Sequence, residues 1–425
     1  MRILMLSQFY PPMIGGEERH VRDLAAALVK RGHDVNVATM WQDDQPATTL
    51  DQGVKVHRLH GMIERCASRL FSETGRPHAP PLPDPELTWH LHQLIAQTKP
   101  DVVHAHNWML HSFLPLKRSH GPRLLVTLHD LSLVCGTKTG MYGDAACTGR
   151  GVRKCLGCAA KHYGAPKGSV TLAANWMSSV IERRLVDMFL AVSNAIAAGS
   201  GLPTGPTPYE VVPNFVRDDI AQLVPDADPR LEQLPKEPYI LFVGDLRRMK
   251  GIDVLLDAYR LLKRAPPLVV IGRPRQEAPP DWPANVHTFE GWPNTAVMHA
   301  WSRCLIGVVP TVGPEACATV VLEAMSLGKP VAASRVGGMP DLITHCEDGL
   351  LSAAGDPVAL AANIQRLLDD PELRTRLSAA GLRKVEAFKA ASVIPRIETA
   401  YRTLIGERTK PSESTPNPIT TCLQS

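Results

Sequence analysis

The opening of the chain alternates short apolar runs with a helical pattern of apolar positions. Residues 2–6 (RILML) and 35–39 form runs of strand length. Between them, apolar residues recur at the spacing of one helix face, at Val21, Leu24, Ala25 and Leu28. Patterns of these two kinds indicate buried strands and an amphipathic helix. The opening therefore predicts a strand–helix–strand unit of a parallel sheet.

The same alternation continues along the chain and starts again after a stretch with many prolines. Further strands of the first series are predicted at 54–59, 102–104, 124–128, 189–192 and 210–212. A second series of strands is predicted at 239–243, 268–271, 286–289, 305–309 and 330–333. The predicted fold class is α/β, with two doubly wound parallel-sheet domains whose ligands approach the carboxyl ends of the strands.

These patterns divide the chain into five predicted parts. The parts are a first domain (1–200), a connector (201–236), a second domain (237–388), a last helix (389–405) and a disordered tail rich in Thr, Ser and Pro (406–425). Near the end of the second domain, Asp356–Pro357 and Asp370–Pro371 predict two capped helix starts.

Composition narrows the class of protein. A length of 425 residues suits two domains, and contents of 44% hydrophobic and 21% charged residues are those of an ordinary globular protein. The net charge of +4 indicates no nucleic-acid partner. No signal peptide and no apolar run long enough to span a membrane are recognised, so a cytoplasmic location is expected. Basic residues near apolar ones leave peripheral contact with an anionic membrane open, at Arg65, Arg69, Lys117, Arg118, Arg183 and Arg184.

The segment 311–343 carries the strongest candidate chemistry. It places Glu315 and Glu323 eight positions apart, with a predicted helix start near Thr319 and Val320 between them. Unpaired backbone N–H groups at a helix start bind anions such as a diphosphate. Carboxylates accept strong hydrogen bonds from sugar hydroxyls, so Glu323 is expected to face a ribose and Glu315 a hexose. The alternative is that these residues only complement the helix dipole.

With its flanks, this segment resembles the donor-site signature of the family 4 glycosyltransferases, and the resemblance covers about 1–405. It implies a GT-B fold, in which two Rossmann-like domains face a central cleft and the helix at 389–405 crosses back to the first domain. It also implies that a hexose moves, with retention, from a nucleotide diphosphate sugar to a glycan, glycolipid or small-molecule hydroxyl, as in polysaccharide biosynthesis, without a required cofactor. Ala316-Cys317-Ala318 departs from the family's usual Gly-Phe-Gly.

Two glycine-containing loops match further parts of the family pattern. In PPMIGGEERHV, Gly16 is expected to approach the diphosphate and Gly15 to lie on the acceptor side. In VGDLRRMKG, Gly244 and Lys250 match the diphosphate-binding loop, but Asp245 stands where the family usually has Arg. Arg248 or its neighbour Arg247 is then expected to supply the missing charge. The alternative for Lys250 is a solvated lysine ahead of a helix.

Histidines follow two of the predicted strands. His129 ends the strand 124–128, where the family's catalytic histidine contacts the transferred sugar, and a packed core residue is the alternative. His104 and His106 share one face of the preceding strand end. Packing and acceptor contact by His106 are expected there, with metal binding as the alternative.

Four cysteines lie in the loop 135–158, at Cys135, Cys147, Cys155 and Cys158. Four thiols that end in Cys-x-x-Cys are able to hold a structural zinc ion in a reducing compartment. Ordinary buried thiols, with one redox pair at most, are the alternative. No catalytic metal is expected.

Two other functions remain open at this stage. One is a sugar-nucleotide epimerase of GT-B shape, which would need donor alone. The other is a non-catalytic nucleotide-sugar-binding relative, a reading that Asp245 and the lost Gly-Phe-Gly favour.

Overall fold

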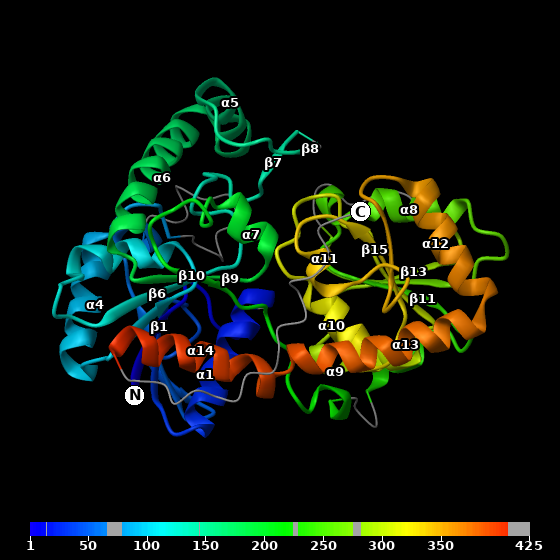
Figure 1. The fold of residues 1–425 in the computed structure, drawn as a ribbon, viewed down its shortest axis with the longest axis horizontal. Coiled ribbons are helices and arrows are strands. Elements are labelled where there is room, and N and C mark those ends of the chain that lie inside the picture. Colours follow the sequence, from blue (N-terminus) through cyan, green and yellow to red (C-terminus); the bar gives the residue numbers. More distant parts are fainter. Residues whose placement is uncertain (14, 66–78, 144, 224–227, 275–281, 407–425) are drawn as a thin grey trace.

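The computed structural model describes residues 1–13, 15–65, 79–143, 145–223, 228–274 and 282–406. The chain forms two lobes that lie side by side, each built on a parallel or mostly parallel sheet between helices (Figure 1). This confirms the predicted fold class. The predicted tail beyond Gly406, and Arg69, lie outside the described residues.

The first lobe contains an eight-stranded sheet with the strand order β10-β9-β6-β5-β1-β2-β4-β3. Its strands are β1 (Arg2–Leu6), β2 (Asp34–Met40), β3 (Thr48–Asp51), β4 (Val54–Leu59), β5 (Val102–Ala105), β6 (Arg123–Leu128), β9 (Met188–Ala191) and β10 (Tyr209–Val211). All neighbours pair in parallel except β3, which is antiparallel to β4. The central strands are buried because α1 (Gly16–Lys30) covers one face and α4 (Pro85–Thr98) the other.

The second lobe contains a fully parallel six-stranded sheet with the order β13-β12-β11-β14-β15-β16. Its strands are β11 (Ile240–Val243), β12 (Leu268–Ile271), β13 (Val286–Phe289), β14 (Ile306–Val309), β15 (Val331–Arg335) and β16 (Leu350–Ala353). Helices α8 (Ile252–Arg260) and α12 (Pro357–Asp369) cover one face, and α9 (Asn294–Arg303) and α10 (Thr319–Ser326) cover the other. The expected caps form: Asp356 begins α12, and Asp370 begins α13 (Pro371–Val385).

A hairpin of helices and a small β-ribbon extend the first lobe. Helices α5 (Val152–Tyr163) and α6 (Ala165–Leu185) pack against each other, and the ribbon pairs β7 (Met141–Tyr142) with β8 (Ala145–Ala146). Both stand at the edge of the lobe in Figure 1. Among the described residues, no helix has both the length and the apolar character of a membrane span.

The last helix, α14 (Ala390–Ile405), follows the second lobe in sequence but packs on the first (Figure 1). Val393, Ile397 and Tyr401 join the core beneath α1. Glu398 is buried between Arg31 (2.6 Å) and His33 (2.7 Å). These contacts tie the end of the chain to its beginning.

Glu398→Ala is expected to lower stability strongly, because it leaves Arg31 and the buried His33 without their carboxylate. Breaking a buried ion pair costs about 3 kcal/mol. Urea unfolding would measure the loss. The control is Arg396→Ala. Arg396 lies on the same helix and forms an exposed ion pair with Glu210 of β10, so its loss should cost less than about 1 kcal/mol. Equal losses in the two variants would show that the Glu398 cluster does not hold the helix.

Candidate active site

A cavity of about 260 Å³ is lined by both lobes, at the carboxyl ends of β6, β11 and β14. The first lobe and the connector contribute Gly16, Glu17, His129, Asp130 and Asn214. The second lobe contributes Phe242, Val243, Gly244, Lys250, Val309, Thr311 and the run from Glu315 to Val320. The cavity thus brings together seven of the predicted site residues: Gly16, His129, Gly244, Lys250, Glu315, Thr319 and Val320.

Two helices begin at this cavity without a side-chain cap. Gly15 precedes α1 and Ala318 precedes α10, and neither position accepts a capping hydrogen bond in its side chain. The first N–H groups of a helix have no partner inside the helix and carry partial positive charge. Both helix starts therefore have backbone N–H groups that an anion could contact.

The loop that carries Glu315 is held by a Gly-Gly turn. A Cβ atom at Gly337, where φ is +56°, would lie 2.1 Å from the carbonyl oxygen of Glu315. The amide of Gly338 donates to that same oxygen at 2.7 Å. Only glycine allows this approach, so the turn fixes the position of the Glu315 backbone beside the cavity.

Lys250 and Glu315 face each other in the cavity. The Nζ atom of Lys250 lies 2.7 Å from Oε2 of Glu315, and Oγ1 of Thr311 is 3.3 Å from that oxygen. The two side chains therefore form an ion pair inside the cavity lining.

Glu323 lies behind the cavity lining and is paired across the two lobes. Its Oε1 accepts from Nη1 of Arg19 on α1 at 2.8 Å. Burial raises the pKa of Glu323, and the charge of Arg19 opposes that shift. Arg19 therefore joins the first lobe to the carboxylate of Glu323, a contact that the sequence did not predict.

Arg248 does not occupy the donor position predicted for it. Its side chain is 69% exposed, and its Nε lies 3.3 Å from the carboxylate of Asp253 in the first turn of α8. Arg247 is likewise 3.8 Å from Asp245. Neither arginine lines the cavity, and both lie near acidic neighbours instead.

Histidines form a buried cluster beside the cavity. Nε2 of His129 lies 3.0 Å from Nδ1 of His106, and the ring of His20 is 5.1 Å from that of His129. Burial lowers the pKa of His129 to about 4 and that of His104 to about 3. These imidazoles are therefore uncharged at neutral pH and act as hydrogen-bonding groups.

Two predicted acceptor-side residues lie elsewhere. His106 is buried behind His129 and does not line the cavity, because its ring stacks between His104 and His129. Gly15 also lies outside the lining, and the carboxylate of Glu18 occupies the space where a Cβ of Gly15 would project. The acceptor contacts predicted for these two residues stay predictions.

Metal-binding geometry appears in a different place from the one predicted. Within the part of the chain that the structure describes, only His20, His106 and His129 gather three ligand atoms within 4.8 Å of one another. Cys135, Cys147, Cys155 and Cys158 are all free and line a second cavity, but no three of their sulfur atoms gather in this way. The predicted structural zinc site is therefore not supported.

Glu17 and Asn214 line the cavity but were not predicted. Glu17 accepts from Nδ2 of Asn107 at 2.6 Å, and burial raises the pKa of Glu17 to about 8. The position of Glu17 directly after Gly16 could have indicated it. Asn214 follows β10 after Pro213, where a strand end faces the cleft.

Two family models match most of the chain. The model described as Glycosyltransferase Family 4 matches residues 14–220, and that described as Glycosyl transferases group 1 matches 226–384. Glycogen synthase of Mycobacterium tuberculosis is 26% identical and aligns over 91% of this chain and 90% of its own. D-inositol 3-phosphate glycosyltransferase of Acidothermus cellulolyticus is 27% identical and aligns over 93% of this chain and 87% of its own.

Solved structures resemble the fold over nearly its whole length. Sucrose-phosphate synthase from Thermosynechococcus elongatus superposes with a TM-score of 0.72 at 21% identity, and the match covers 96% of this chain and 100% of that one. The Anabaena protein HepE, solved in complex with UDP-glucose, has a TM-score of 0.67 at 16% identity, with coverages of 95% and 100%.

Arg19→Ala is expected to tighten nucleotide binding by roughly fivefold, because it removes the guanidinium that competes for Glu323 at a cost of about 1 kcal/mol. Calorimetric titration with UDP, ADP and GDP would measure the change. Arg22→Ala is the matched control, since Arg22 lies one turn later and pairs with Asp51 inside the first lobe. Weaker binding by the Arg19 variant would show that Arg19 contacts the nucleotide instead.

The affinity for the same nucleotides is expected to fall as the pH rises through about 8. Glu17 then loses its proton, and its new negative charge repels the diphosphate. The affinity should fall by roughly tenfold. Glu18, Asp130 and Lys138 are the other charges acting on Glu17. Glu17→Gln should abolish this fall, and a fall that persists in the variant would assign it to another group.

Proposed function

Because this chain belongs to the family 4 glycosyltransferases, we propose that it moves a hexose from a nucleotide diphosphate sugar to an acceptor hydroxyl, with retention at the anomeric carbon. The observation that carries the proposal is the meeting of Lys250, Glu315 and the start of α10 in one cavity with His129 of the other lobe. Two lobes that close around such a cavity exclude water from the reacting sugar.

The leaving diphosphate would be held by the second lobe. Lys250, Thr319 and Val320 all line the cavity, and the first amides of α10 lack a side-chain cap. Their positive charge matches the negative charge that grows on the diphosphate as the bond from C1 to its oxygen breaks. Gly16, at the start of α1, supplies a second set of amides from the first lobe.

Glu315 and Glu323 would hold the two sugars of the donor. Glu315 already accepts hydrogen bonds in the cavity and would accept them from hexose hydroxyls after Lys250 turns to the phosphate. Glu323 would accept from the ribose once Arg19 releases it. Charge-assisted bonds of this kind are about twice as strong as neutral ones.

His129 would present a hydrogen-bond donor to the transferred sugar. Nε2 of His106 is buried and has no partner, so a proton there would be an unsatisfied donor. The favoured arrangement places the proton of His106 on Nδ1, which then donates to Nε2 of His129. The proton of His129 is left on Nδ1, away from His106.

The proposed transfer has three bond changes. The bond from C1 to the phosphate oxygen breaks, the acceptor oxygen bonds to C1 on the same face, and the acceptor proton passes to the leaving phosphate. No bound metal takes part in this scheme. The donor is a nucleotide sugar such as the UDP-glucose bound by HepE, and the acceptor is a glycan or a lipid-linked sugar in polysaccharide biosynthesis. A cytoplasmic enzyme with peripheral membrane contact fits these substrates.

A panel of UDP-, GDP- and ADP-sugars tested by thermal shift would identify the donor, since a bound ligand raises the melting temperature. With that donor, Lys250→Ala should lower kcat by roughly 100-fold or more, because it removes the charge that meets the leaving group. Lys263→Ala, an exposed lysine of the same lobe, is the control.

Three outcomes would contradict the proposal. One is that no nucleotide sugar binds, which would exclude both a transferase and an epimerase. Another is a kcat for Lys250→Ala within a few-fold of the wild type. The last is conversion of the donor sugar without acceptor, which would indicate an epimerase.

A further inference from the structure

Three histidines from separate segments of the first lobe have ring nitrogens close to one another. His20 lies on α1, His106 follows β5, and His129 follows β6. One ring nitrogen from each lies within 4.8 Å of those from the other two. The strands β1, β5 and β6 are neighbours in the sheet, so the fold itself brings the three rings together. The transfer scheme uses His129 and its hydrogen bond from His106, and it gives His20 no role.

The hydrogen bonds of the buried histidines separate a structural ring from rings that could bind an ion. Nδ1 of His104 bonds to the hydroxyl of Tyr401, and its Nε2 bonds to the hydroxyl of Thr127, both at 2.7 Å. His104 therefore has no nitrogen left for an ion. Nδ1 of His20, by contrast, is buried and has no hydrogen-bond partner among the described residues. A buried polar atom without a partner is rare in folded proteins, and a bound ion is one explanation for it.

The separation of the nitrogens suits a transition-metal ion. Nδ1 of His106 and Nε2 of His129 are 3.0 Å apart. Two nitrogen ligands of a tetrahedral zinc ion, each about 2.0 Å from the metal, lie about 3.3 Å apart. Only a small widening of the pair would therefore admit an ion between the two rings. The ring of His20 is close enough to complete the set by a small rotation of its side chain.

The kind of ligand selects the class of ion. Imidazole nitrogen binds Zn²⁺ and its neighbours in the first transition row, whereas Mg²⁺ and Ca²⁺ take oxygen ligands. Three imidazoles around Zn²⁺ leave a fourth position for a water molecule. His129 lines the cavity between the lobes, so an ion and its water can enter from there. Asp130 lines the same cavity, and its carboxylate would offset part of the added positive charge.

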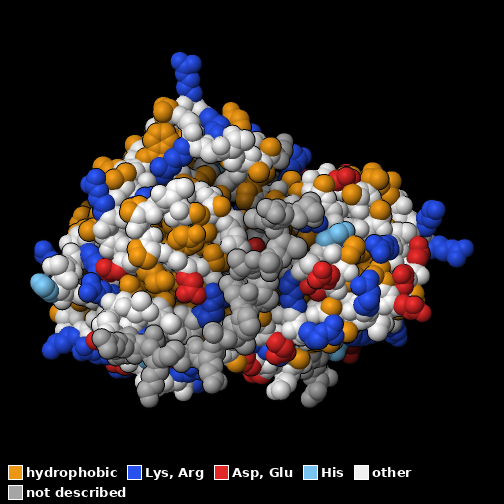
Figure 2. Space-filling model, viewed as in Figure 1, with side chains coloured by type: hydrophobic (Ala, Val, Ile, Leu, Met, Phe, Trp, Pro, Cys, Tyr) orange, Lys and Arg blue, Asp and Glu red, His pale blue; other side chains and the backbone are white. Residues whose placement is uncertain are grey.

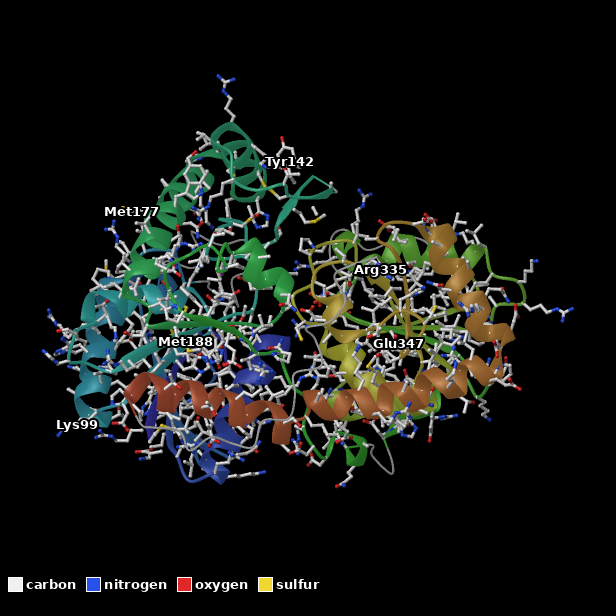
Figure 3. The ribbon with its side chains drawn as sticks, in the orientation of Figure 1. Lys99, Tyr142, Met177, Met188, Arg335 and Glu347 are labelled. Carbon is white, nitrogen blue, oxygen red and sulfur yellow. The ribbon has the colours of Figure 1, made fainter. Side chains whose placement is uncertain are left out.

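The histidine cluster is separate from the four cysteines of the loop 135–158. Those thiols line the larger cavity together with Tyr142, which lies near the tip of the first lobe in Figure 3. Histidine side chains appear only as isolated spots on the face drawn in Figure 2, whereas His20 and His106 are 7% and 3% exposed. An ion held by the three imidazoles would thus be enclosed in the protein, apart from the path through the cavity beside His129.

We propose that His20, His106 and His129 form a binding site for a single Zn²⁺ ion. The ion replaces the proton between Nδ1 of His106 and Nε2 of His129, and that proton moves to Nε2 of His106. Because Nε2 of His106 is buried without a partner, the move costs free energy and keeps the affinity moderate. The inference goes beyond the proposed function and needs no transferase activity.

A bound ion would connect three segments that meet at the cavity. It would join α1, whose uncapped start carries Gly16, to the ends of β5 and β6. The ligand atom of His129 is Nε2, so its Nδ1 keeps the proton that the transfer scheme places there. The site therefore fixes the ring of His129 in place and takes no part in the bond changes at the sugar.

Equilibrium dialysis of chelator-treated protein against zinc chloride tests the site. The chain should bind a single Zn²⁺ ion but no Mg²⁺, and zinc should raise the melting temperature, since a ligand of the folded state stabilises it. His20→Phe, which keeps an aromatic ring against Phe215, should weaken zinc binding by about 100-fold or more, because losing even an outer-shell partner costs roughly 10- to 100-fold. His92→Phe, at an exposed position of α4, is the matched control. Both variants should melt like the wild type in the presence of chelator.

Cobalt(II) gives a readout that a change in packing cannot produce. Co²⁺ bound by three imidazoles and water should show the visible absorption bands of a tetrahedral ion without a charge-transfer band from thiolate. His20→Cys should keep the ion and add that charge-transfer band, because thiolate is also a ligand for this class of ion. The double variant Cys155→Ser, Cys158→Ser should bind cobalt as the wild type does.

Four outcomes would overturn the histidine site. They are a wild type that binds no zinc, zinc binding that is unchanged in His20→Phe, a thiolate charge-transfer band in the wild type, and loss of binding in the double cysteine variant. None of them bears on the nucleotide-sugar experiments. Conversely, a chain that binds zinc through His20 but no nucleotide sugar would lose the transferase function and keep this site.

Discussion

The placement of positive charge at one cavity is the constraint on which the rest of the structure depends. Parallel strands direct their carboxyl ends to one edge, and each lobe turns that edge toward the other. Two helices begin there without caps, and Lys250 adds a full charge. Acidic side chains balance positive charge at this place: Glu315 pairs with Lys250, and Glu323 pairs with Arg19. The site thus contains one ion pair within the second lobe and one that joins the two lobes.

Local pattern was sufficient for much of the fold and for the centre of the site. The predicted strand at 54–59 is β4, and the caps Asp356 and Asp370 form because a short-range hydrogen bond needs only the next three residues. Gly244 reaches the cavity because it directly follows β11, and Lys250 and Glu315 lie in the segments that follow the carboxyl ends of β11 and β14. The short strands β3 and β16 escaped prediction, since neither has a long apolar run.

Contacts between distant parts of the chain could not be predicted in this way. Arg19 and Glu323 are 304 positions apart, and only the approach of the two lobes makes them partners. Arg248 was assigned to the donor because Asp245 stands where the family usually has Arg, whereas the structure places its guanidinium beside Asp253, the first acid of α8. The four thiols share one cavity, but their spacing in sequence does not decide the distances among their sulfur atoms.

Helix α14 has a further consequence for the way the enzyme can be divided. The hydroxyl of its Tyr401 forms a hydrogen bond with Nδ1 of His104 at 2.7 Å, and the ring of His104 contacts that of His106, which forms a hydrogen bond with His129. Helix α14, at the far end of the polypeptide, therefore completes part of the core of the first lobe and supports its histidine cluster. A chimaera that joins this first lobe to the donor half of a relative would receive a foreign helix in that groove. Such hybrids should cross over twice, so that residues 390–405 travel with the N-terminal half.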